Sequence, residues 1–269
     1  MKKSLVYFLF QLFLMMELFF LKEKFGYLIC CIAYVILASS AESRTLSGEE
    51  IMKRVDKNRI YEKIEYNGKM TVKKGDKARV KLMHVYAEGT DKALIEFTNP
   101  EDKGTKYLKL SNELWMYFPD AEDVIKISGH MFRESMMGSD FSYEDAMENE
   151  ELLNKYSVEV LGSETVNDRD CYVLELITKD KKITYAKRKL WVDKENFVVL
   201  KTQLFALSGK LLKEAVMEDV KKYDDRYFVT KLTMMNKLIK DSATVFEMTD
   251  INFGVDIPDG TFSKRSLGR

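Results

Sequence analysis

The stretch KMTVKKGDKARVKL, residues 69–82, decides the fold class of this chain. Met70 and Val72 alternate with polar residues, and the alternation resumes after residue 78. A period of two is typical of a β-strand that buries one face. Gly75-Asp76 lies between the two runs, and such a dipeptide favours the tight turn of a hairpin. This stretch therefore predicts an antiparallel β-hairpin.

Similar short alternating runs continue over most of the chain. The predicted strands are residues 69–73, 79–82, 93–97, 107–110, 113–118, 124–127, 157–161, 171–178, 183–193, 197–205, 210–220, 227–236 and 242–250. Only three prolines occur in the sequence, so long strands can keep their ladder donors. An antiparallel sheet of about a dozen strands tends to curl or close. We therefore expect a mainly β fold with one curled sheet.

Two segments depart from the alternation. Ser47 and Glu50 are spaced as a capping box, which predicts an amphipathic helix from there to about Asn58. Residues 128–154 are rich in methionine and show no period of two. Ser139-Asp140 precedes an acidic stretch and predicts a loop that enters a short helix. We expect residues 128–154 to form a lid-like insertion over the sheet.

The first 41 residues differ in composition from the rest. Two apolar runs, residues 5–21 and 25–38, are separated by Lys22-Glu23-Lys24. A basic start, an apolar core and small residues before Glu42 are typical of a secretory signal peptide, so we predict residues 1–41 as a signal peptide and 42–269 as a single domain. The first run would then be an over-long extension, or the chain would start at Met15 or Met16.

Two other interpretations of this region remain open. The first run nearly reaches the length that spans a bilayer, so the two runs could be a retained membrane anchor. Cys30 and Cys31 could also carry a lipid, although Ile29 before them does not fit a lipidation site. Cleavage after residue 41 would leave Cys171 as the one cysteine, without an internal disulfide.

Charge and motif content argue against several functions. Lys and Arg number 43 and Asp and Glu number 43, so we expect no nucleic-acid partner. His84 and His130 are the two histidines, and neither lies in a catalytic motif, so we predict no catalytic residues. No zinc motif or phosphate-binding glycine motif is present, so we predict no metal site and no cofactor. The acidic residues at 144, 145, 148, 150 and 151 are interpreted as a solvated helix face.

Apolar side chains suited to a ligand are abundant instead. Methionine adapts to variable apolar ligands, and several methionines lie in the irregular segment 128–154, whereas Met70, Met116 and Met217 fall in strands and are interpreted as core. Strand alternation points Trp115 and Met116 to opposite faces. A curled sheet can enclose a ligand, and a flexible segment across its mouth would shield that ligand from water. The candidate cavity or lid residues are Trp115, Phe118, Met131, Phe132, Met136, Met137, Phe141, Tyr143 and Trp191.

Three stretches carry a resemblance to a known family. ELWMYFP (113–119), ISGHM (127–131) and SMMGSDFSYED (135–145) resemble the central signature of the LolA-like outer-membrane lipoprotein-sorting family. Further similarity lies in LWVD (190–193) and in residues 250–265, so the resemblance covers nearly all of residues 45–269. It implies an incomplete, strongly curved antiparallel β-barrel with an apolar cavity that receives acyl chains in the periplasm.

The resemblance also implies a function. The chain is similar to the broader branch of the family, which implies a non-catalytic carrier of acylated lipoprotein or phospholipid cargo. An inner-membrane exporter or transporter and an outer-membrane acceptor are the implied partners. A different class remains open, a lipid hydrolase that would use Asp140, Glu144 or Asp145 with a water or a cation. A membrane-tethered scaffold or envelope-stress sensor is the third alternative.

Overall fold

The computed structural model describes residues 46–148, 152–180 and 183–268. All the described elements belong to one compact unit that begins at Ser47. The predicted signal peptide, residues 1–41, lies outside the described residues. Within the described ranges, no helix is both long and apolar enough to cross a membrane.

Thirteen strands in the described part of the chain form one antiparallel sheet that is not closed, which confirms the mainly β prediction. They are β1 (Lys63–Lys74), β2 (Lys77–Glu88), β3 (Lys92–Phe97), β4 (Lys106–Leu110), β5 (Glu113–Phe118), β6 (Asp123–Ile127), β7 (Tyr156–Val166), β8 (Arg169–Thr178), β9 (Lys187–Asp193), β10 (Val199–Phe205), β11 (Leu211–Tyr223), β12 (Arg226–Asn236) and β13 (Ser242–Phe253). The predicted hairpin is β1 and β2, in which Lys74 pairs with Lys77. Gly75 between them has a φ of +55°, a conformation that glycine adopts without strain.

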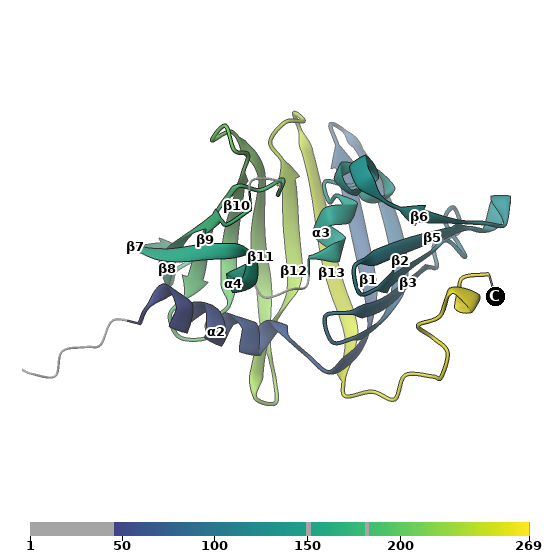
Figure 1. Ribbon diagram of the computed structural model, residues 1–269, viewed down its shortest axis with the longest axis horizontal. Coiled ribbons are helices and arrows are strands. Elements are labelled where there is room, and N and C mark those ends of the chain that lie inside the picture. Colours follow the sequence, from purple (N-terminus) through teal and green to yellow (C-terminus); the bar gives the residue numbers. More distant parts are fainter. Residues whose placement is uncertain (1–45, 149–151, 181–182, 269) are drawn as a thin grey trace, which may run out of the picture. The chain divides into compact units, whose positions relative to one another are not determined.

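The order of the strands explains where the irregular segment lies. The sheet runs β6-β5-β4-β3-β2-β1-β13-β12-β11-β10-β9-β8-β7, so the first and last strands are neighbours at the centre. β6 and β7 follow one another in the chain but form the two opposite edges. The connection between them must therefore cross a whole face of the sheet. Figure 1 shows the sheet curving around this connection and around the N-terminal helix.

Helix α2 (Gly48–Arg59) begins at the predicted capping box. The Ser47 hydroxyl accepts from the Glu50 backbone N–H, and the Glu50 carboxylate accepts from the Ser47 backbone N–H. α2 buries Met52 and Val55 and contacts β7 and β12. It therefore covers the half of the sheet that begins at β12, next to the central β13.

The C-terminal segment covers the face of β3–β5 that points away from the connection between β6 and β7. Leu267 is fully buried against Leu108, and Phe262 packs in the same cluster. The short helix η4 (Lys264–Ser266) places the Lys264 ammonium 3.6 Å from the centre of the Trp115 ring. The two faces of this half of the sheet are thus covered by different segments.

Candidate functional site

Residues 128–148, called the cover segment below, fill one half of the curved face. The segment contains η2 (Gly129–Arg133), η3 (Met136–Gly138) and α3 (Tyr143–Met147), and α4 (Leu152–Lys155) leads from it to β7. It packs on β1–β6 in a single apolar cluster. Six predicted site residues come together there: Met131, Phe132, Met136, Met137, Phe141 and Tyr143.

This half of the sheet is closely packed. Tyr107 from β4 is fully buried, and its hydroxyl lies 3.2 Å from the Met137 sulfur and 3.3 Å from the Tyr143 hydroxyl. Met70 and Met116 belong to the same cluster, as their strand positions predict. Burial and the neighbouring Tyr143 raise the pKa of Tyr107 far above its ordinary value. The cover segment here acts as core.

The other three predicted site residues lie elsewhere. Trp115 packs with the C-terminal segment on the opposite face from Met116, as the alternation predicts. Phe118 is exposed at the end of β5. Trp191 packs against Cys171 and donates its indole N–H to Glu164 at 2.7 Å.

Asp140 attaches the cover segment to the centre of the sheet. Its buried carboxylate accepts hydrogen bonds from the hydroxyls of Ser242 and Thr244, both at 2.6 Å, and from the backbone N–H of Asn236 at 3.1 Å. The Asp140 N–H donates in turn to the Thr244 hydroxyl. A buried carboxylate with this many donors is costly to displace, so the attachment is firm.

Asp145 makes a second attachment. It caps α3 by accepting from the Ser142 backbone N–H at 2.7 Å, and it accepts from the Tyr185 hydroxyl at 2.7 Å. The Lys213 ammonium of β11 is paired with the same carboxylate, and both side chains are nearly buried. Burial and Asp145 raise the pKa of Tyr185 far above its ordinary value. Asp145 thus joins the cover segment to β11 and to Tyr185 before β9.

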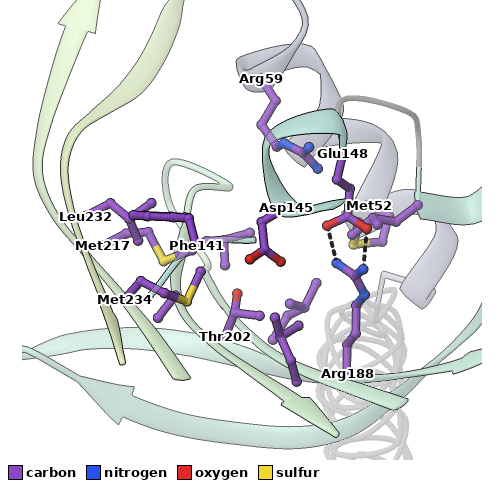
Figure 2. Close-up of a pocket in the computed structure, with 15 residues that line it drawn as sticks. Met52, Arg59, Phe141, Asp145, Glu148, Arg188, Thr202, Met217, Leu232 and Met234 are labelled. Atoms are coloured by element: carbon purple, nitrogen blue, oxygen red, sulfur yellow. Dashed lines mark hydrogen bonds and ion pairs between the residues drawn. The ribbon is translucent and has the colours of Figure 1, made fainter. Parts of the chain in front are cut away.

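Arg188 and Glu148 form a third attachment. The Arg188 guanidinium donates two hydrogen bonds to the Glu148 carboxylate, and it lies over the Tyr156 ring at 4.8 Å. Burial alone would lower the pKa of Arg188, but the adjacent Glu148 carboxylate outweighs it and raises that pKa. This ion pair is drawn with dashes in Figure 2. It joins the end of the cover segment to β9.

The other half of the curved face is not filled. Beneath α2 lies a cavity of about 250 Å³, lined on the sheet side mainly by apolar residues of β9–β12. Figure 2 shows Met217, Leu232 and Met234 gathered on one side of it, with the Arg188–Glu148 pair on the other. The complete lining is Met52, Arg59, Phe141, Asp145, Glu148, Leu152, Arg188, Leu190, Val199, Thr202, Leu204, Ala215, Met217, Leu232 and Met234.

A second cavity of about 200 Å³ adjoins the first. The two share four lining residues, which are Arg59, Val199, Met217 and Leu232. The second cavity continues along α2 past Val55 to Tyr227 and Phe228. Together they form an elongated apolar space roofed by one helix.

The lining differs from the candidate residues of the sequence analysis. Of those candidates, only Phe141 lines the first cavity. Met217, interpreted as core from its strand position, lines both cavities instead. Trp191 follows Leu190 in β9, and alternation directs it away from the cavity that Leu190 lines. The apolar face of α2 was the signal that the sequence analysis missed. This face points at the sheet and lines both cavities through residues such as Met52 and Val55.

Several side chains that could act in catalysis are engaged in contacts within the protein. The carboxylates of Asp140 and Asp145 already accept several hydrogen bonds each. His84 lies on β2, which lines neither cavity, and its ring nitrogens contact the side chains of Asn67 and Glu65. Burial raises the pKa of the Cys171 thiol to about 11, so it is not a nucleophile at neutral pH. No group of three or more metal-ligating side chains occurs among the residues that the structure describes.

Comparison with known proteins places the chain in a family. A family model described as "Uncharacterized protein" matches residues 89–269. The structure is similar to that of a DUF1329 family protein from Desulfovibrio piger, with 26% identity, a TM-score of 0.76, and coverage of 82% of this chain and 97% of that chain. It is similar to a putative outer membrane lipoprotein-sorting protein domain from Vibrio parahaemolyticus, with 27% identity, a TM-score of 0.74, and coverage of 82% and 98%.

The chain belongs to the LolA-like family. A LolA superfamily protein from Nitrosomonas europaea shares the fold of this LolA-like protein, with 24% identity, a TM-score of 0.68, and coverage of 82% of this chain and 100% of that chain. A search of curated proteins gives no match. The predicted curved, open antiparallel sheet is therefore confirmed for this LolA-like protein.

Proposed function

We propose that this LolA-like protein is a periplasmic carrier that binds an acyl chain of a lipoprotein or lipid and moves it towards the outer membrane. The observation that carries the proposal is the elongated apolar space beneath α2. Each buried methylene is stabilised by about 0.8 kcal/mol, so an acyl chain gains from a continuous apolar lining. The carrier-type fold of the family agrees with this role.

The size of the space favours a small number of chains. The cavities of about 250 and 200 Å³ together lie in the lower part of the range usual for small ligands, roughly 300–1,000 Å³. One acyl chain fits such a space better than the several chains of a fully acylated lipoprotein. We therefore propose that the described conformation holds one chain.

The role proposed is binding without catalysis. Two of the three carboxylates that a hydrolase could use, Asp140 and Asp145, already hold the cover segment in place. An inner-membrane exporter would deliver the cargo in this scheme, and an outer-membrane acceptor would receive it. Met136 and Met137, predicted as lid residues, would then pack between the cover segment and the sheet and would not contact the ligand.

Titration of a fluorescent fatty acid tests the proposal. Leu232 lines both cavities, so Leu232→Trp should fill the space between them. Excluding about two methylenes costs about 1.6 kcal/mol, so we expect an affinity at least about tenfold weaker than that of the wild type. Leu161→Trp is the matched control, because Leu161 on β7 is half exposed and lines neither cavity.

The control should bind within about twofold of the wild type. Urea unfolding of both variants checks that each is folded. A wild-type protein that takes up no fatty acid would contradict the proposed function. Equal binding by wild type and Leu232→Trp would show that any site lies outside the space beneath α2.

A further inference from the structure

Three hairpin turns lie side by side at one end of the strands. They are residues 74–77 between β1 and β2, 206–210 between β10 and β11, and 237–241 between β12 and β13. The Gly75 N–H donates to the Asp241 carbonyl at 2.9 Å, and the Lys237 N–H donates to the Leu212 carbonyl at 2.8 Å. Figure 1 shows the three turns together at the top of the view. They are called the tip surface below.

The tip surface presents apolar side chains to solvent. Leu207 is 71% exposed, Leu238 is 53% exposed and Ile239 is 45% exposed. Hairpin turns ordinarily carry glycine, asparagine, aspartate or serine, because those residues suit the backbone and the solvent. Large aliphatic residues here cost solubility and make no contribution to the core. Several large exposed apolar residues on neighbouring turns are typical of an interaction site.

The same surface carries an excess of positive charge. Its exposed lysines are Lys73, Lys74, Lys77, Lys210, Lys237 and Lys240. Asp76 and Asp241 are the acidic residues within the same turns and the adjoining end of β1. The whole chain balances 43 basic against 43 acidic residues, so the excess is local. Among these lysines, Lys237 pairs with Glu214 at 3.1 Å, and Lys240 lies 4.0 Å from Asp241 in an exposed pair.

We propose that the tip surface docks onto a membrane surface that carries anionic lipid headgroups. Aliphatic side chains flanked by lysine suit this interface, since the aliphatic groups enter the boundary of the acyl region and the lysines remain among the headgroups. Each lysine near an anionic leaflet strengthens binding about fivefold. An anionic bilayer uses both the exposed aliphatic side chains and the surrounding lysines, whereas a protein partner would not require the two together.

The position of the tip surface gives docking a consequence for the cavity. Asn236 and Ser242, which bracket the turn 237–241, hold the Asp140 carboxylate of the cover segment. Met234, two residues before Asn236, lines the first cavity. The hairpin of β12 and β13 thus joins the docking surface, the cover and the cavity in one element. A docked protein would hold its cavity next to the membrane.

Tryptophan fluorescence of the full chain tests the inference. Leu238→Trp places a reporter on the tip surface, and Leu161→Trp places a matched reporter on β7 at a side chain of similar exposure. Vesicles of brominated phosphatidylcholine quench a tryptophan that enters the bilayer. With phosphatidylglycerol added to these vesicles, we expect quenching of Leu238→Trp beyond that of the wild type, and none beyond it for Leu161→Trp. A local reporter is needed because residues 1–41 are apolar and could bind vesicles by themselves.

Charge removal completes the test. Adding Lys74→Gln, Lys77→Gln and Lys240→Gln to the Leu238→Trp chain should raise the lipid concentration for half-maximal quenching about a hundredfold. Quenching that needs neither phosphatidylglycerol nor the lysines would overturn the inference, and so would equal quenching of the two reporters. A shift in Leu238→Trp emission that follows protein concentration instead of lipid would assign the surface to contacts between copies of the chain, and would also overturn it. None of these outcomes depends on fatty-acid binding.

Discussion

The two halves of the curved sheet bury their apolar faces by different means. Over β1–β6 the cover segment inserts methionines and aromatic rings until the space is full. Over β9–β12 the helix α2 spans the sheet and leaves two adjoining cavities beneath it. Both spaces are partly open to solvent, so a ligand can reach them. Under the proposed function, the filled half supports the fold and the open half holds the ligand.

Polar attachments join the two halves. Asp145 and Glu148 of the cover segment lie at the border, paired with Lys213 and Arg188 from the open half. These ion pairs are nearly buried, and their removal leaves a charge without a partner. They attach the cover segment at the border of the first cavity, which Asp145, Glu148 and Arg188 line.

The largest effect is expected where the halves are joined. Glu148→Ala leaves the buried Arg188 guanidinium without its carboxylate, so we expect the free energy of unfolding to fall by about 4 kcal/mol in urea titrations. Exposed Glu159 on β7 gives the matched control, and Glu159→Ala should change the free energy of unfolding by less than about 0.5 kcal/mol. Equal losses for both variants would mean that the Arg188–Glu148 pair stabilises the protein no more than an exposed carboxylate does.

A smaller effect should distinguish filled space from open space directly. Met136→Ala removes a buried side chain from the filled half, and we expect a loss of about 3 kcal/mol with fatty-acid binding retained. Met217→Ala enlarges a cavity that already exists, so its loss should stay below about 1 kcal/mol. Urea unfolding measures both. A greater loss for Met217→Ala than for Met136→Ala would reverse the assignment of the two halves.

Local patterns predicted most of the fold. The alternating runs gave thirteen strands near their observed positions, although β9 begins at Lys187 and not at residue 183. The Ser47–Glu50 spacing correctly predicted α2, since a capping box is complete within four residues. The Trp115–Met116 alternation also held. In each case the signal lies within a few residues of the feature.

The site was harder to predict, because an alternating strand shows which face is buried but not what fills the space above it. Met70 and Met217 have equivalent strand patterns, yet Met70 is core and Met217 lines the cavities. The Arg188–Glu148 pair spans forty residues and two elements, so no local motif reveals it. Which half stays open depends on where the connection between β6 and β7 crosses the sheet, a property of strand order.

The most direct test of the account is native mass spectrometry of the protein exported in bacteria, with organic extraction of whatever co-purifies. The account predicts that the wild type carries a lipid with an acyl chain and that Leu232→Trp is empty, because that substitution fills the space beneath α2. Leu161→Trp should carry the same lipid as the wild type. Equal lipid content in wild type and Leu232→Trp, or a wild type that is empty and takes up no added lipid, would contradict the claim that the open half is a lipid site.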